Sequence, residues 1–149
     1  MRARINQDVK DAMKSGDKQR LSTLRLITAA IKDRELGIGG GAPTEIVDQD
    51  VVAILQKMLK QRRESIATYE KAGRNDLADQ EKAELAVIEG YLPTQMNEAE
   101  ARAAITAIVA ELGAAGPKDM GRVMGALKSR FSTTMDFGKA SAMLKELLK

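Results

Sequence analysis

Apolar residues recur every three or four positions along most of the chain, which is the period of an amphipathic helix. Ile5, Val9, Ala12 and Met13 share one face of a first predicted helix. The pair Ser15-Gly16 ends that helix, because glycine is typical of the position just after a helix C-terminus.

A second helix is expected to begin after Asp17, whose short carboxylate side chain suits an N-cap, and to fade at Gly37. Its expected apolar face is wide and consists of Leu21, Leu24, Leu26, Ile27, Thr28, Ala30 and Ile31. The glycine-rich segment 37–43 follows. It has neither the Gly-Lys-Ser/Thr sequence nor the preceding strand of a phosphate-binding loop, so a flexible linker is favoured.

The middle of the chain predicts two long helices in an antiparallel hairpin. The first runs from about Asp48 to Ala72, Gly73-Arg74-Asn75 breaks it, and the second is stopped by Pro93. The apolar stripe of the first is Val51, Leu55, Met58, Leu59, Ile66 and Tyr69, and that of the second is Leu77, Leu85, Ile88 and Leu92.

The C-terminal third predicts three further helices after a boundary at 93–96. Asn97 and Glu100 form a capping-box pattern that opens the first, and Pro117 suits the start of the second, which runs to Arg130. The third starts near Asp136. The expected core residues of the first and third are Ala101, Ile105, Ile108, Leu112, Phe137, Ala140, Leu144, Leu147 and Leu148. The fold class is therefore all-α, with an N-terminal domain over 1–93 and a small three-helix domain over 97–149.

Composition limits the chemistry that this chain is expected to perform. Its 149 residues include no cysteine and no histidine, which removes thiolate nucleophiles, zinc–thiolate sites and the commonest general base. We assign no catalytic residue, metal ligand or cofactor. The pairs Asp48/Asp50 and Glu81/Glu84 have the chemistry of divalent-cation ligands, but helix capping and solvent exposure explain them better.

The same composition gives an expectation for location. No apolar run approaches the roughly 20 residues of a membrane span, and the N-terminal sequence lacks the apolar segment of a signal peptide. We expect a cytoplasmic protein with no membrane partner.

The helix predicted over 117–130 separates into two faces at 100° per residue. One face is apolar and consists of Met120, Val123, Met124, Leu127 and Phe131, while the opposite face contains Lys118, Gly121, Arg122, Gly125, Lys128 and Ser129. Each glycine inside a helix costs about 1 kcal/mol relative to alanine, so two glycines need a reason. Glycine allows another molecule to approach the helix backbone closely, which is such a reason. The flanking cations favour the phosphate backbone of a nucleic acid as that molecule.

Net charge agrees with this interpretation. Residues 116–149 contain seven Lys/Arg and three Asp/Glu, a net charge of +4, whereas residues 1–115 contain 17 and 18, a net charge of −1. The structural alternative is a solvated basic face whose glycines pack on a neighbouring helix. Aromatic residues make up only 3% of the chain, which disfavours base stacking on single strands.

Arg62 falls on an apolar stripe, and Arg63 lies beside it. Reflecting the predicted hairpin about residue 74 places Glu81, Glu84 and Glu89 within reach of these arginines. A structural ion pair is the favoured interpretation, and an anion site is the functional alternative.

Four segments resemble the GatB/YqeY family in order and spacing. They are LSTLRLITAAIKDRE (21–35), LQKMLKQRRESIATYEKAGRNDLADQEKAE (55–84), IEGYLPTQM (88–96) and GPKDMGRVMGALKSR (116–130). The resemblance is to a stand-alone YqeY-like protein, and it implies a C-terminal domain similar to the tail of the B subunit of the glutamine-dependent tRNA amidotransferase. That tail is associated with holding tRNA, while the chemistry occurs in a separate catalytic domain.

Carried onto this sequence, the resemblance implies RNA binding by Lys118, Gly121, Arg122, Gly125 and Lys128. Arg25, Lys32, Arg62 and Arg63 belong to the N-terminal motifs and form a second basic set. The expected partner is tRNA, with amidotransferase or aminoacyl-tRNA synthetase machinery as further partners and no DNA. A carbon–nitrogen ligase label with glutamine as amido-N-donor is attached to the family, but we do not expect this chain to catalyse that reaction alone. The competing hypothesis is a protein–protein adaptor in which the two glycines seat a partner helix.

Overall fold

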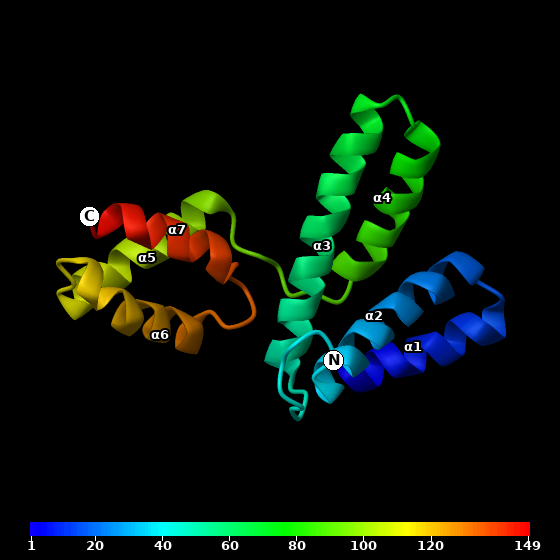
Figure 1. Ribbon diagram of the computed structural model, residues 1–149, viewed down its shortest axis with the longest axis horizontal. Coiled ribbons are helices and arrows are strands. Elements are labelled where there is room, and N and C mark those ends of the chain that lie inside the picture. Colours follow the sequence, from blue (N-terminus) through cyan, green and yellow to red (C-terminus); the bar gives the residue numbers. More distant parts are fainter. The chain divides into compact units, whose positions relative to one another are not determined.

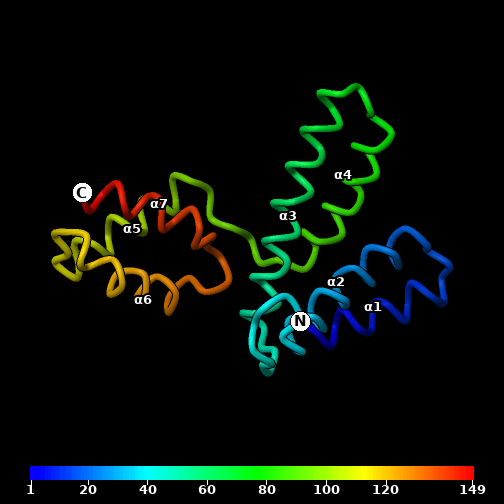
Figure 2. Tube along the Cα trace, in the orientation of Figure 1, coloured from blue at the N-terminus to red at the C-terminus, as the bar shows by residue number.

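The computed structural model describes residues 1–149 and contains seven α-helices, one 3-10 turn and no strand, which confirms the all-helical prediction. The elements in Figures 1 and 2 are α1 (Arg2–Ser15), α2 (Lys18–Leu36), α3 (Asp48–Lys71), α4 (Asn75–Glu89), α5 (Glu98–Leu112), η1 (Pro117–Asp119), α6 (Met120–Arg130) and α7 (Phe137–Leu147). The chain divides into two compact units, Met1–Leu92 and Pro93–Lys149. The predicted limits of separate domains, 1–93 and 97–149, stay a prediction.

In the first unit α1 and α2 lie side by side, joined by a tight turn (Figures 1 and 2). Gly16 closes α1 with a φ of 73°, and the Asp17 carboxylate accepts a hydrogen bond from the Arg20 N–H at 3.2 Å. Gly37 closes α2 with a φ of 75°, and a Cβ there would lie 2.5 Å from the Gly41 carbonyl oxygen. These helix ends are the predicted ones.

Helices α3 and α4 form the predicted antiparallel hairpin, with Gly73 in the connecting turn at a φ of 72° (Figure 1). At the start of α3 the Val47 N–H donates to the Asp50 carboxylate at 3.0 Å. Helix α4 ends at Glu89, earlier than Pro93, because the N–H groups of Tyr91 and Leu92 bond the carbonyls three residues back and tighten the chain into a turn.

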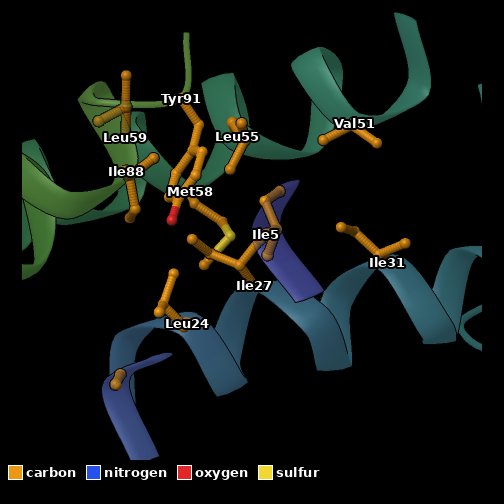
Figure 3. Packing of buried hydrophobic residues seen from close by; sticks show 11 residues of the cluster. Ile5, Leu24, Ile27, Ile31, Val51, Leu55, Met58, Leu59, Ile88 and Tyr91 are labelled. Atoms are coloured by element: carbon orange, nitrogen blue, oxygen red, sulfur yellow. The ribbon is translucent and has the colours of Figure 1, made fainter. Parts of the chain in front are cut away.

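The core of the first unit is almost entirely aliphatic. Figure 3 shows side chains from α1, α2, α3 and α4 directed toward a common centre. Its buried residues are Ile5, Ala12, Leu24, Ile27, Ile31, Val51, Leu55, Met58, Leu59, Ile88 and Tyr91. The sparse use of aromatic residues is thus compensated by branched side chains that interlock between the helices.

Two residues that we placed on apolar faces are in fact exposed. Met13 is 51% exposed and Leu26 is 44% exposed. Met13 follows the buried Ala12 and lies about 100° further around α1, outside the part of the helix that is covered. Leu26 points away from the side on which Leu24 and Ile27 are covered, because α2 is packed on one side only.

Tyr91 anchors the C-terminal end of the first unit to α1 and α2. Its hydroxyl donates a short hydrogen bond to the Asp8 carboxylate, and the Arg20 guanidinium lies 3.3 Å from the hydroxyl and 3.6 Å from that carboxylate. The Arg4 guanidinium lies 4.9 Å from the centre of the ring. Burial, and then the neighbouring Asp8, raise the pKa of the Tyr91 phenol to about 12. The sequence did not predict this network, since Tyr91 and Asp8 are 83 residues apart.

The second unit packs α5, α6 and α7 around its own core. The predicted capping box opens α5: the Asn97 side chain accepts from the Glu100 N–H at 2.8 Å, and the Glu100 carboxylate accepts from the Asn97 N–H at 3.1 Å. Asp136 caps α7 through the N–H groups of Gly138 and Lys139. The buried residues are Ala101, Ile105, Ile108, Val123, Leu127, Met135, Ala140, Leu144 and Leu148. Leu147, which we placed in this core, is 42% exposed, because Leu144 and Leu148 occupy the covered side.

Candidate nucleic-acid interface

The entry into α6 is held by one carboxylate. Asp119 accepts hydrogen bonds from the N–H groups of Ala115 at 3.0 Å and Gly116 at 3.3 Å. These bonds to the charged form lower the pKa of Asp119, so it is ionised at neutral pH. Pro117 begins the 3-10 turn that leads into the helix. The segment that leads into α6 is therefore held by local hydrogen bonds.

Helix α6 has the two faces that its sequence predicted. Val123 and Leu127 are fully buried, with Met120 and Met124 partly buried beside them. The opposite face is exposed at Gly121, Arg122, Gly125 and Lys128. Lys118, which we placed in the same helix, is also exposed but lies in the 3-10 turn that precedes α6. We call these five residues the α6 basic face. Its role in binding RNA stays a prediction.

The two glycines of this face have open space above them. A Cβ built on Gly121 or Gly125 would have no neighbour within 4 Å. No other helix of the second unit packs against them, which argues against the alternative that they serve internal packing. Neither has a positive φ. Glycine stabilises a helix less than alanine does, and neither packing nor backbone conformation inside this unit explains why glycine occupies these two positions.

The cations around α6 differ in how far they are neutralised. Arg122 lies 3.3 Å from Asp119, and Arg130 forms a two-pronged pair with Glu111 at 2.7 and 2.8 Å, which lowers the pKa of Glu111. Lys118 and Lys128 have no carboxylate within ion-pair distance. These two lysines are therefore the cations most available to an incoming anion, with Arg122 partly available.

The second basic set separates in the structure. Arg62 is 16% exposed and lies 3.3 Å from Glu84 and 3.8 Å from Glu81, and Arg63 lies 3.4 Å from Glu89. Both are paired with α4, which confirms the ion-pair interpretation of Arg62.

Arg25 and Lys32, by contrast, lie together on α2. They line one groove with Arg2 and Asn6 of α1. The four residues of the second basic set are thus two pairs in different surroundings.

The carboxylate pairs that have cation-ligand chemistry are otherwise engaged. Asp48 lies 3.2 Å from the terminal ammonium of Met1, and Asp50 caps α3 and lies 3.7 Å from Arg34. Glu81 and Glu84 lie against Arg62. Charged residues also interrupt α3, the longest helix, and none of the helices combines the length and the apolar character needed to cross a membrane.

Fold and surface together define a class: an all-helical protein without histidine or cysteine, in which a short helix displays cations and two uncovered glycines. A sequence model described as Yqey-like protein matches residues 2–148, and the chain belongs to the YqeY-like family.

Three of the similar curated proteins are named "Altered inheritance of mitochondria protein 41, mitochondrial". The protein from Pyrenophora tritici-repentis is 33% identical over 134 residues, covering 85% of this chain and 71% of the relative. That from Kluyveromyces lactis is 34% identical over 118 residues, covering 77% and 62%. That from Clavispora lusitaniae is 30% identical over 149 residues, covering 97% and 82%. For Kluyveromyces lactis the match thus spans about three fifths of the relative's length.

These names contradict the cytoplasmic location expected from the sequence, because the relatives are mitochondrial proteins. The expectation rested on the lack of a membrane span and of the apolar segment of a signal peptide. Neither feature distinguishes a cytoplasmic protein from a mitochondrial one, and this is the reason for the error.

Proposed function

We propose that this protein binds structured RNA, with tRNA as the expected ligand, through the α6 basic face. The observation that carries the proposal is the open space over Gly121 and Gly125, on the same exposed face as Lys118 and Lys128. Helix-interior glycines that touch nothing in their own unit are consistent with an external surface that approaches the backbone closely. The adjacent cations make a phosphodiester backbone the complementary surface.

The mode of binding follows from the side chains present. Lysines act as point charges on phosphates, and the chain has few aromatic groups on which bases could stack. Double-helical RNA hides its base edges in a deep groove and is recognised by shape and backbone. We therefore expect binding that depends on the fold of the RNA and steeply on salt, with little dependence on its sequence.

The proposal includes no chemical step by this chain. The reaction of an amidotransferase or of an aminoacyl-tRNA synthetase would belong to partner proteins, and this chain would hold the RNA for them. A carbon–nitrogen ligase activity with glutamine as donor would likewise belong to such a partner.

A protein–protein adaptor is the second candidate. The spacing of Gly121 and Gly125, one helical turn apart on an open face, also suits the close approach of a partner helix. The two hypotheses differ in what they predict for a glycine variant: the RNA hypothesis expects weaker RNA binding, and the adaptor hypothesis expects no change in it.

Gly125→Ala is the sharpest test. The added methyl meets nothing in the structure, so the helix should gain about 1 kcal/mol of stability while RNA affinity falls. Affinity would be measured by fluorescence anisotropy with labelled tRNA, and stability by urea unfolding. An adaptor would lose its protein partner in pull-downs and keep any RNA binding unchanged.

A charge variant locates the site independently. Lys118→Gln with Lys128→Gln should reduce the slope of log affinity against log salt by about 0.7–0.9 for each phosphate that is no longer neutralised. The matched control is Lys139→Gln with Lys145→Gln, which removes the same charge from exposed positions on α7. Equal effects of the two double variants would show that net charge, and not the α6 basic face, governs binding. Absence of salt-dependent tRNA binding by the unaltered protein would refute the proposed function.

A further inference from the structure

The first two helices are as basic as the C-terminal segment. Residues 1–36 contain nine Lys/Arg and five Asp/Glu, a net charge of +4, and residues 37–115 contain eight and thirteen, a net charge of −5. The near-neutral balance of residues 1–115 therefore hides a basic helix pair and an acidic middle segment. This helix pair contains Arg25 and Lys32.

The exposed cations of α2 lie in one line. Lys18, Ser22, Arg25, Ala29 and Lys32 are all exposed and follow one another at intervals of four and three residues, so they share one face of the helix. The buried residues Leu24, Ile27 and Ile31 lie on the opposite face. At a rise of 1.5 Å per residue, the cations recur about every 10 Å along the axis. The side chains between these cations are small, namely Ser22 and Ala29, so they do not block access to the helix surface there.

Two hollows flank this line of residues. One, of about 380 Å³, is lined by Lys18, Ser22 and Arg25 together with Leu21 and Leu26. The other, of about 430 Å³, lies along α1 and is lined by Arg2, Asn6, Arg25, Thr28, Lys32 and two apolar residues. Arg25 lines both hollows.

The charges beside these hollows are incompletely neutralised. Glu35 lies 2.8 Å from Arg2 and 3.4 Å from Lys32, so one carboxylate serves two cations. Arg25 has no carboxylate within ion-pair distance, and its guanidinium contacts the Met13 sulfur at 3.7 Å, a weak acceptor. The set Arg2, Arg25, Lys32 and Glu35 therefore has a net charge of +2, and most of the Arg25 donors are free.

We propose that this surface, the α2 cationic face of Lys18, Arg25, Lys32 and Arg2, is a second phosphate-binding surface for the RNA bound by the protein. It rests on the proposed function in one respect, namely that the ligand is RNA. A line of cations beside open, shallow hollows suits an extended polyanion better than a small nucleotide, which is held in an enclosed pocket. Asn6 and Thr28 supply neutral polar groups of the kind that also contact sugar and phosphate oxygens.

The test uses the full chain and tRNA binding measured from low to moderate salt. Arg25→Gln with Lys32→Gln should reduce the salt slope by about 1.5, which corresponds to two phosphates. The matched control is Lys57→Gln with Lys60→Gln, which removes the same charge from exposed positions on α3. It should change the slope by much less. The melting temperatures of both variants should stay close to that of the unaltered protein, since all four side chains are exposed.

The outcomes separate the two proposals. If the α6 variants weaken RNA binding and the α2 variant equals its α3 control, the α2 surface is refuted and the proposed function stands. If the α2 variant reduces the slope and the α6 variants do not, the α2 surface is supported and the α6 site is refuted. The last measurement is binding of the same variants to vesicles that contain anionic phosphatidylglycerol. Loss of vesicle binding with intact RNA binding in the α2 variant would make this face a membrane-surface site and overturn the inference.

Discussion

Replacement of Arg62 by methionine is the most informative perturbation of the first unit. Arg62 lies between α3 and α4, and its side chain is 16% exposed, with Glu84 and Glu81 at 14% and 23%. Its Nε is buried and forms no hydrogen bond, although the Glu84 carboxylate is 3.3 Å away. Methionine keeps an unbranched apolar stem and lacks the guanidinium group, so the substitution removes the charge and its N–H donors.

The expected cost can be worked from these distances. Two unit charges 3.3 Å apart attract by about 5 kcal/mol at an effective dielectric constant of about 20, and desolvation offsets most of this. Removing one partner of a buried pair costs about 3–5 kcal/mol, because the remaining charge is left uncompensated. Since these groups keep some exposure, we expect Arg62→Met to lower the free energy of unfolding at pH 7 by about 2–3 kcal/mol.

The loss should depend on pH. Burial, and then the charge of Glu84, already raise the pKa of Glu81, and Arg62 opposes this. Without Arg62 the pKa of Glu81 in the folded state rises further. Between the pKa of the unfolded state and that of the folded state, the folded protein then binds more protons than the unfolded protein. Stability then falls as pH rises through the folded pKa. The deficit of Arg62→Met should therefore be smaller at pH 5 than at pH 8.

Thermal unfolding followed by circular dichroism measures this effect. In a unit of this size about 1 kcal/mol shifts the melting temperature by about 4–8 °C, so the expected loss of about 2–3 kcal/mol corresponds to a fall of about 8–24 °C. The matched control is Arg63→Met, the next residue, whose pair with Glu89 is 59% and 49% exposed and is worth about 0.5 kcal/mol or less. Adding Glu81→Gln and Glu84→Gln to Arg62→Met should recover much of the loss. Equal melting temperatures for the two arginine variants would refute the reasoning.

Three further predictions concern single interactions. The hydrogen bond from Arg2 lowers the pKa of the Glu35 carboxyl to about 2, so NMR titration should give a pKa well below that of an ordinary glutamate. Arg2→Gln should return this pKa toward 4.5. The stability that the ionised Glu35 contributes is lost as pH falls through the range between these two pKa values. Asn97→Ala should destabilise the second unit by about 1 kcal/mol through loss of the α5 cap, whereas Thr94→Ala at an exposed position should not, as urea unfolding would show. The Tyr91 phenol should ionise near pH 12 in ultraviolet titration, and an ordinary value near 10 would contradict its burial against a carboxylate.

The helices and most of their ends could be predicted from the order of residues along the chain. Gly16, Asp17, Gly37 and the Asn97–Glu100 box act within a few residues of their own position, so their effect is readable from local order. The hairpin of α3 and α4 was equally predictable, since a two- to three-residue turn leaves no other neighbour. The same local geometry led from Arg62 to Glu81 and Glu84.

The two faces of α6 also followed from the sequence, because a helix of known phase sorts its side chains without outside information. The meaning of its glycines did not follow. Only the packed structure shows whether a neighbouring helix of the same unit occupies the space above Gly121 and Gly125, and it leaves that space open.

The packing of the helices determines which of several apolar positions are covered and which distant charges meet. Met13, Leu26 and Leu147 are as apolar as their buried neighbours, but a helix packed on one side has room for only part of an apolar surface. The contact of Tyr91 with Asp8 and the groove shared by Arg2 and Arg25 join residues far apart in the chain. Helical periodicity reports the direction of a side chain relative to its own axis. It contains no information about which other helix lies in that direction, and this is the reason why these contacts required the fold.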